Sequence, residues 1–146
     1  MTKPHYIPQG LSPITPQLVV SGGKAAIDFY QKAFGAELLH AMPDAKTGGI
    51  MHAALKIGEG TFFLSDASSF SKPTTANNYV YVRDVDALFE RAVKAGATVL
   101  APLSNMFWGD RWGMVADPFG NQWQLGCKVE DVTPEDMQKR MAQLPG

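Results

Sequence analysis

The chain has 146 residues, and its 13 basic and 14 acidic side chains leave a formal net charge of −1. This near balance, without a cluster of lysine or arginine, argues against nucleic acid as a partner. No apolar run approaches the roughly 20 residues of a membrane span, and the single cysteine, Cys127, excludes an intramolecular disulfide. We therefore expect one soluble, cytoplasmic domain, residues 1–146, with no membrane partner.

The first half of the chain reads as an extended lead-in followed by a strand, a helix and three strands. Pro4, Pro8, Pro13 and Pro16 predict the extended start, because proline restricts its own backbone and that of its predecessor. A strand begins near residue 14 or 17. A helix is expected over residues 24–34, with Gly35 as its left-handed stop. Strands are predicted over residues 37–42, 50–57 and 61–65.

The second half repeats this order after a polar linker, residues 68–77. A strand is predicted over residues 78–82 and a helix over 85–95, with Asp84 as its N-cap. Strands follow over residues 98–101, 111–116 and 122–128. Thr133-Pro134-Glu135-Asp136 then predicts the start of a short C-terminal helix, about residues 133–144. Met137, Met141 and Leu144 share one face of it, so we expect it to dock on the domain or on a partner subunit.

Short phrases match between the two halves. Gln17-Leu18-Val19-Val20 and Phe34-Gly35-Ala36 correspond, without a gap, to Asn78-Tyr79-Val80-Tyr81 and Ala95-Gly96-Ala97. The repeat predicts an α+β fold of two βαβββ modules, about residues 14–67 and 78–128. Two matched half-domains commonly build a pseudo-symmetric site.

This repeated order, with Asp117-Pro118-Phe119-Gly120-Asn121 before the last strand, resembles the vicinal oxygen chelate superfamily of glyoxalase I, bleomycin-resistance proteins and extradiol dioxygenases. The phrases Met51-His52-Ala53, Leu64-Ser65-Asp66 and Trp108-Gly109-Asp110-Arg111, with residues 26–36, are similar to its PhnB-like subgroup. The resemblance implies a curved mixed sheet around a central cleft, a small-molecule ligand in that cleft, and a homodimer.

The resemblance also implies four positions for a divalent metal, taken from the first and last strand of each module. In this sequence they are Gln17, Leu64, Asn78 and Gln124. Neutral amides bind such cations weakly and leucine offers no donor atom, so we expect the usual metal site to be absent and predict no cofactor. A register slip of two would substitute Asp66 for Leu64 and allow a divalent metal held by His52, Asp66 and Gln124.

Strand alternation suggests which side chains would line the cleft. If Gln17 and Gln124 point inward, period two places Val19, Phe62, Leu64, Asp66, Asn78, Val80 and Gln122 on the same face. Leu18, Val20, Phe63, Trp123 and Leu125 would then pack under the helices. Apolar walls with a few amide or acid groups are typical of a small-molecule site.

Two groups of residues have possible chemistry. His52 would act as a base or metal ligand if it met Asp66 across the sheet; the alternative is a hydrogen-bonded structural histidine. Trp108 would stack on a planar ligand and Arg111 would clamp an anionic one; the alternative is an Asp110–Arg111 surface pair beside two packing indoles. Asp117 is expected to hydrogen-bond its own turn.

Three functional hypotheses follow. The first is a protein that binds a small organic molecule through Gln17, Phe62, Asn78, Trp108, Arg111 and Gln124 without the usual metal. The second is a lyase, isomerase or dioxygenase of the same superfamily, with His52 and Asp66 as catalytic residues around a shifted metal. The third is a non-catalytic interaction module, favoured if side chains fill the cleft. The sequence does not choose between an enzyme and a binding protein.

Overall fold

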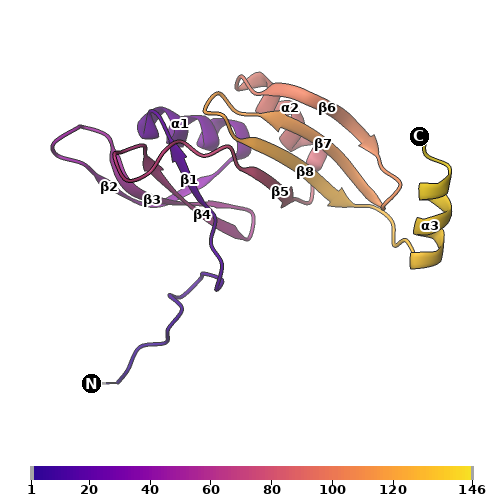
Figure 1. Cartoon of the computed structure of the whole chain (residues 1–146), viewed down its shortest axis with the longest axis horizontal. Helices are drawn as coiled ribbons and strands as arrows, with labels where there is room; N and C mark the ends of the chain where they lie inside the picture. The colour runs from indigo at the N-terminus through magenta and orange to yellow at the C-terminus, as the bar shows by residue number, and fades with distance from the viewer. Residues whose placement is uncertain (1, 146) are drawn as a thin grey trace. The chain divides into compact units, whose positions relative to one another are not determined.

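The computed structural model describes residues 2–145, which form two compact units (Figure 1). The first unit comprises the chain up to Gln31 together with Gly35–Thr74, and the second comprises Lys32–Phe34 with the chain from Thr75 onward. Each unit contains a four-stranded mixed sheet. Within the described residues, no helix has the length and apolar character needed to cross a membrane.

The first sheet has the strand order β1-β4-β3-β2. Its elements are β1 (Gln17–Val20), α1 (Gly23–Phe34), β2 (Glu37–Pro43), β3 (Ile50–Ile57) and β4 (Gly60–Asp66). β1 runs parallel to β4, and the other neighbours are antiparallel. Helix α1 ends at Gly35, whose left-handed backbone, with φ of 64°, lets its N–H bond the Tyr30 carbonyl.

The second sheet repeats the arrangement with the order β5-β8-β7-β6. Its elements are β5 (Asn77–Tyr81), α2 (Val85–Lys94), β6 (Thr98–Asn105), β7 (Asp110–Ala116) and β8 (Gln122–Lys128), followed by α3 (Pro134–Ala142). Figure 1 shows α2 lying against this sheet. The approach is close, because a Cβ on Gly113 would lie 2.7 Å from the Phe89 ring. The predicted repeat of strand, helix and three strands is therefore confirmed.

The predicted helix caps are confirmed. Asp84 accepts the Ala87 N–H, and Thr133 accepts the Asp136 N–H. Helix α3 ends at Ala142, earlier than expected, and none of its residues is buried. It is held by Arg140, which donates to the Phe107 carbonyl at 3.0 Å and forms two hydrogen bonds with Glu130.

The pairing register contradicts the predicted alternation in the first sheet. Gln17 pairs with Phe63 and Leu18 pairs with Leu64. Phe63 therefore shares the face of Gln17, whereas Phe62, Leu64 and Asp66 lie on the opposite face. That opposite face packs against α1, where the Phe62 ring meets Tyr30 edge-on with centroids 5.6 Å apart. The predicted faces of β4 were wrong by one residue. The parallel pairing of β1 with β4 decides which β4 residues share the face of Gln17, and a single sequence does not reveal that pairing.

The same correction applies to β5 in the second sheet. Asn78 pairs with Trp123 and Tyr79 pairs with Gln124. Asn78 and Val80 therefore lie on the face that α2 covers, rather than on the face of Gln124. Trp123 and Leu125 are buried under the helix, as predicted. The two tyrosines of β5 consequently lie on the face that α2 does not cover.

Candidate functional site

A group of aromatic side chains surrounds one buried carboxylate on this uncovered face of the second sheet. Asp110, the first residue of β7, is 4% exposed. Its Oδ2 accepts hydrogen bonds from the hydroxyls of Tyr79 at 2.5 Å and Tyr81 at 2.7 Å, and from the indole N–H of Trp108 at 3.0 Å. Trp112 stands edge-on to Trp108, with centroids 5.7 Å apart. We call Tyr79, Tyr81, Trp108 and Trp112, with Asp110, the aromatic face.

Local sequence explains how these rings reach one acid. Tyr79 and Tyr81 are two residues apart on β5, so they project from the same side of the sheet. Gly126 leaves the space that the Tyr79 ring occupies, because a Cβ there would lie 2.9 Å from Tyr79 Cε1. Gly109 has a φ of 101°, a conformation that favours glycine, at the turn that brings Trp108 back toward Asp110.

The aromatic face keeps Asp110 ionised and its tyrosines neutral. Burial alone would raise the pKa of Asp110, but the hydrogen bonds from Tyr79, Tyr81 and Trp108 outweigh it and lower that pKa below its ordinary value. Burial and the bond to Asp110 raise the pKa of Tyr79, and the bond to Asp110 raises the pKa of Tyr81. At neutral pH one negative charge therefore sits behind a set of neutral rings.

A chain of amide hydrogen bonds borders the aromatic face. Trp112 donates its indole N–H to Gln124 Oε1 at 3.0 Å, and Gln124 Nε2 donates to Asn77 Oδ1 at 3.1 Å. Of the predicted ligand-binding residues, Trp108 and Gln124 are thus brought to one face of one sheet. Tyr79, Tyr81 and Asp110 were missed as site residues. The alternation of tyrosines in Asn78-Tyr79-Val80-Tyr81 was visible in the sequence, but its direction required the register.

The predicted pair of His52 and Asp66 does not form. Ala53 pairs with Leu64, so His52 projects from one face of the sheet and Asp66 from the other. Asp66 accepts the backbone N–H groups of Gly22 and Gly23, both at 2.9 Å, and of Ile50 at 2.7 Å. Burial raises the pKa of Asp66, but the three backbone hydrogen bonds outweigh burial and lower that pKa below its ordinary value. Asp66 therefore caps the start of α1 rather than polarising a histidine.

His52 instead has aromatic neighbours. Its ring lies 4.8 Å from Phe63 and 5.4 Å from His40, measured between centroids. Gln17, on the same face, donates weakly to Ser65 Oγ at 3.4 Å. This face of the first sheet thus carries two histidines and an amide without a carboxylate partner among the described hydrogen bonds.

Two further predicted ligand residues lie on helix-covered faces. Arg111 makes a two-pronged bond to Asp86, with Nε–Oδ2 at 2.9 Å and Nη2–Oδ1 at 2.8 Å. Because Asp110 and Arg111 alternate along β7, the surface pair between them, which was the alternative to a ligand clamp, does not form either. Asn78 Nδ2 is buried and has no hydrogen-bond partner among the described residues. Asp117, as expected, accepts the Phe119 and Asn121 N–H groups of its own turn.

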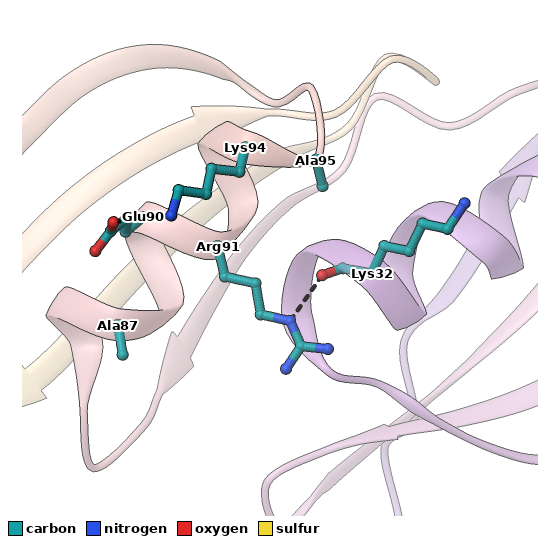
Figure 2. A pocket seen from close by; sticks show the side chains of 6 residues that line it. All are labelled: Lys32, Ala87, Glu90, Arg91, Lys94 and Ala95. Atoms are coloured by element: carbon teal, nitrogen blue, oxygen red, sulfur yellow. Dashed lines mark hydrogen bonds and ion pairs between the residues drawn. The ribbon is translucent and has the colours of Figure 1, made fainter.

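A separate hollow of about 490 Å³ lies along α2 (Figure 2). It is lined by Lys32, Ala87, Glu90, Arg91, Lys94 and Ala95. Arg91 Nε donates to the Lys32 carbonyl at 2.7 Å, and Lys94 pairs with Glu90 at 3.1 Å. Figure 2 shows the long side chains of Lys32, Arg91 and Lys94 among the lining residues. Side chains of this kind have many rotamers, so the hollow lacks the rigid walls and converging polar groups of a built site.

The sequence and the fold of this chain are similar to those of known proteins. The model of the Glyoxalase/Bleomycin resistance protein/Dioxygenase superfamily matches residues 10–125. The chain belongs to this superfamily. An uncharacterized protein of Mycobacterium tuberculosis is 41% identical over 140 residues, which cover 88% of this chain and 82% of that protein.

Solved structures of other proteins share the fold. TioX from Micromonospora sp. ML1 is 30% identical with a TM-score of 0.69, covering 81% of this chain and 99% of that one. A PhnB protein from Bacillus cereus, described as a putative 3-demethylubiquinone-9 3-methyltransferase, is 20% identical with a TM-score of 0.59. That match covers 80% of this chain and 99% of the other, and it shows the fold alone.

Within each sheet, the two residues that the resemblance implied for a metal lie on opposite faces, Gln17 against Leu64 and Asn78 against Gln124. Leu64 is fully buried and faces α1, Asn78 faces α2, and neither supplies an anionic donor. Asp66, considered in place of Leu64 as a metal ligand, is not available either, because its carboxylate accepts hydrogen bonds from three backbone N–H groups. Within residues 2–145, no group of three or more His, Cys, Asp or Glu side chains is placed to hold a metal ion.

Proposed function

We propose that this glyoxalase-superfamily protein binds a small, planar organic molecule on the aromatic face, without the metal site usual in its family. Binding or sequestration is then its activity, in a reducing compartment such as the cytoplasm that its single cysteine fits. The observation that carries the proposal is the set of rings held by Asp110 while staying accessible: Tyr79 is 38% exposed and Tyr81 is 61% exposed.

The energetics favour a ligand of this kind. Exposed aromatic side chains hold apolar area in water, and covering it with a flat molecule is favourable at about 25 cal/mol per Å². Tyr79, Tyr81 and Trp108 are already fixed by hydrogen bonds to Asp110, and Trp112 by its bond to Gln124, so a ligand loses little free energy in ordering these rings. Gln124 and Asn77 add amide groups at the border that would orient the polar edge of the ligand.

Tryptophan fluorescence tests the proposal on the whole chain. A panel of planar aromatic compounds is titrated against the protein, and we expect at least one class to change the emission saturably. Trp112→Leu should abolish or strongly weaken that response. Trp123→Phe is the matched control, since Trp123 is 2% exposed on the helix-covered face. Absence of binding by every compound, or equal binding by Trp112→Leu, would refute the proposal.

The metal part of the proposal has a separate test. Protein purified without chelator should contain no stoichiometric divalent ion in elemental analysis. A stoichiometric ion lost on His52→Ala, or on Gln124→Ala, would favour the metal-dependent alternative instead.

We also propose that the protein is a homodimer. Large apolar side chains remain open to solvent on the single chain, including Met51 at 58% and Met42 at 52% exposure in the first unit. A second copy is the simplest cover for such a surface. Sedimentation at several protein concentrations should give a dimer mass, and a monomer mass throughout would contradict this proposal.

A further inference from the structure

The aromatic face differs from an ordinary apolar patch in having a buried charge behind it. Asp110 and Asp117 are the two carboxylates classed as buried in the described residues. Asp117 is engaged by the N–H groups of its own turn and by the buried Trp123 indole. The side-chain donors of Asp110, in contrast, are all aromatic groups.

The charges around this face leave it negative. Lys128 on β8 is the backbone pairing partner of Asp110 on β7. Its ammonium group forms its ion pair with Asp131 instead, at 2.5 Å, and the side chains of Lys128 and Asp131 are both exposed. Arg111 lies on the other side of β7, engaged by Asp86. The Glu130–Arg140 pair near Phe107 is neutral as a unit. The group of Asp110, Lys128 and Asp131 therefore carries a net charge of one negative.

The hydrogen bonds to Asp110 make the faces of these rings more negative toward a ligand. Tyr79 and Tyr81 lie 5.0 Å apart between centroids with planes tilted by 33°, and Trp108 Nε1 also approaches the Tyr79 hydroxyl at 3.3 Å. A phenol or indole that donates to a carboxylate becomes richer in electrons on its ring. Such a π-face attracts cations, and sets of aromatic rings bind quaternary ammonium groups in this way.

We propose that the aromatic face selects a planar organic cation, a ligand whose aromatic system carries a quaternary or protonated nitrogen. This rests on the proposed function and specifies its ligand class. The cation stacks on Tyr79, Tyr81 and Trp108, and the Asp110 carboxylate compensates its charge through the rings rather than by direct contact.

A set of three probes of matched shape tests the selectivity. N-methylquinolinium is the cation, 1-methylnaphthalene its neutral counterpart and 1-naphthoate an anion, each titrated by tryptophan fluorescence at pH 8. We expect the cation to bind about tenfold more tightly than the neutral probe, with the anion weakest. Asp110→Asn should reduce the preference for the cation to about twofold or less.

Control variants keep the test decisive. Asp86→Asn changes the net charge by the same amount on the opposite side of the sheet, and it should leave the preference unchanged. Tyr81→Leu removes one ring while keeping Asp110, so it should lower cation affinity even if Asp110→Asn fails to fold. Equal or tighter binding of the neutral or anionic probe by the native protein would overturn the inference while leaving the proposed function standing. Failure of all three probes to bind would count against both.

Discussion

The carboxylate of Asp66, at the end of β4, holds the backbone N–H of Gly23 at 2.9 Å in the first turn of α1. A Cβ on Gly23 would lie 2.7 Å from Asp66 Oδ2, so the contact requires a glycine at the helix start. Helix α1 has no acidic residue in its own first turn and no side-chain N-cap. Asp66 supplies from a distant strand the anion that a helix N-terminus favours.

Asp66→Asn should therefore destabilise the first unit. The variant replaces a charge-assisted acceptor of three N–H groups with an amide whose NH₂ would face one of them. We expect a loss of about 1.5–3 kcal/mol in the free energy of unfolding. Urea denaturation followed by circular dichroism measures it. Glu59→Gln, an exposed carboxylate in the turn at the opposite end of β4, is the control and should change stability little. Equal stability of Asp66→Asn and the native protein would contradict the capping role.

Stability should fall on acidification because both Asp66 and Asp110 have pKa values lowered by folding. A depressed folded pKa means that the unfolded chain binds more protons, so the free energy of unfolding rises with pH in that range. The contribution is complete above the unfolded value near 4 and disappears as pH falls through the lower folded values. Urea midpoints measured between about pH 6 and pH 3 should decline, and Asp66→Asn should flatten the decline. An unchanged slope in that variant would assign the acid sensitivity to other groups.

Gly126→Ala should disturb the aromatic face without touching Asp110. The added methyl would meet the Tyr79 ring at 2.9 Å and its hydroxyl at 3.1 Å, so the ring must shift, and its hydrogen bond to Asp110 is disturbed. We expect ligand affinity to drop severalfold, with a stability loss of about 1–3 kcal/mol from overpacking. Gly60→Ala, where the nearest atom is 3.7 Å away, is the matched strand control. Native affinity in Gly126→Ala would show that Tyr79 does not contact the ligand.

Asn78→Val distinguishes a ligand-binding amide from a structural one. Asn78 Nδ2 is buried without a partner, and valine suits a strand packed under a helix. If Asn78 has no ligand, the variant should be as stable as the native protein or up to about 1 kcal/mol more stable. Probe affinity should stay unchanged. A marked loss of probe affinity, with the stability of the variant unchanged, would instead show that Asn78 contributes to ligand binding.

Residues close together in the sequence predicted most of the helices and strands. Gly35 ended α1, Asp84 capped α2 and Thr133 capped α3 as expected, because each feature depends on a few neighbouring residues. The strand β6 was predicted to end at residue 101 but continues to Asn105. Its register shifts around Ala101 and Ser104, and such irregularities carry no strong signal in one sequence.

The candidate site was predicted only in part. Trp108 was selected for its indole on a turn and Gln124 for its place in the last strand, and both border the face that the structure shows. His52 and Asp66 were joined on the assumption that they meet across the sheet, and the register separates them onto two faces. Asp110 was considered only as a partner for Arg111, although three aromatic donors from other positions converge on it.

The amino-acid sequence by itself determined the repeated strand and helix order and the helix caps, because these follow from periodicity, turn chemistry and neighbouring residues. The superfamily came from the resemblance of short motifs to a known family. The tertiary structure decided which face each strand side chain occupies. That choice depends on parallel pairing between strands distant in the sequence, β1 with β4 and β5 with β8, and a shift of one residue exchanges the two faces completely. Asp66 thereby became a helix cap, and Asp110 became the centre of the aromatic face.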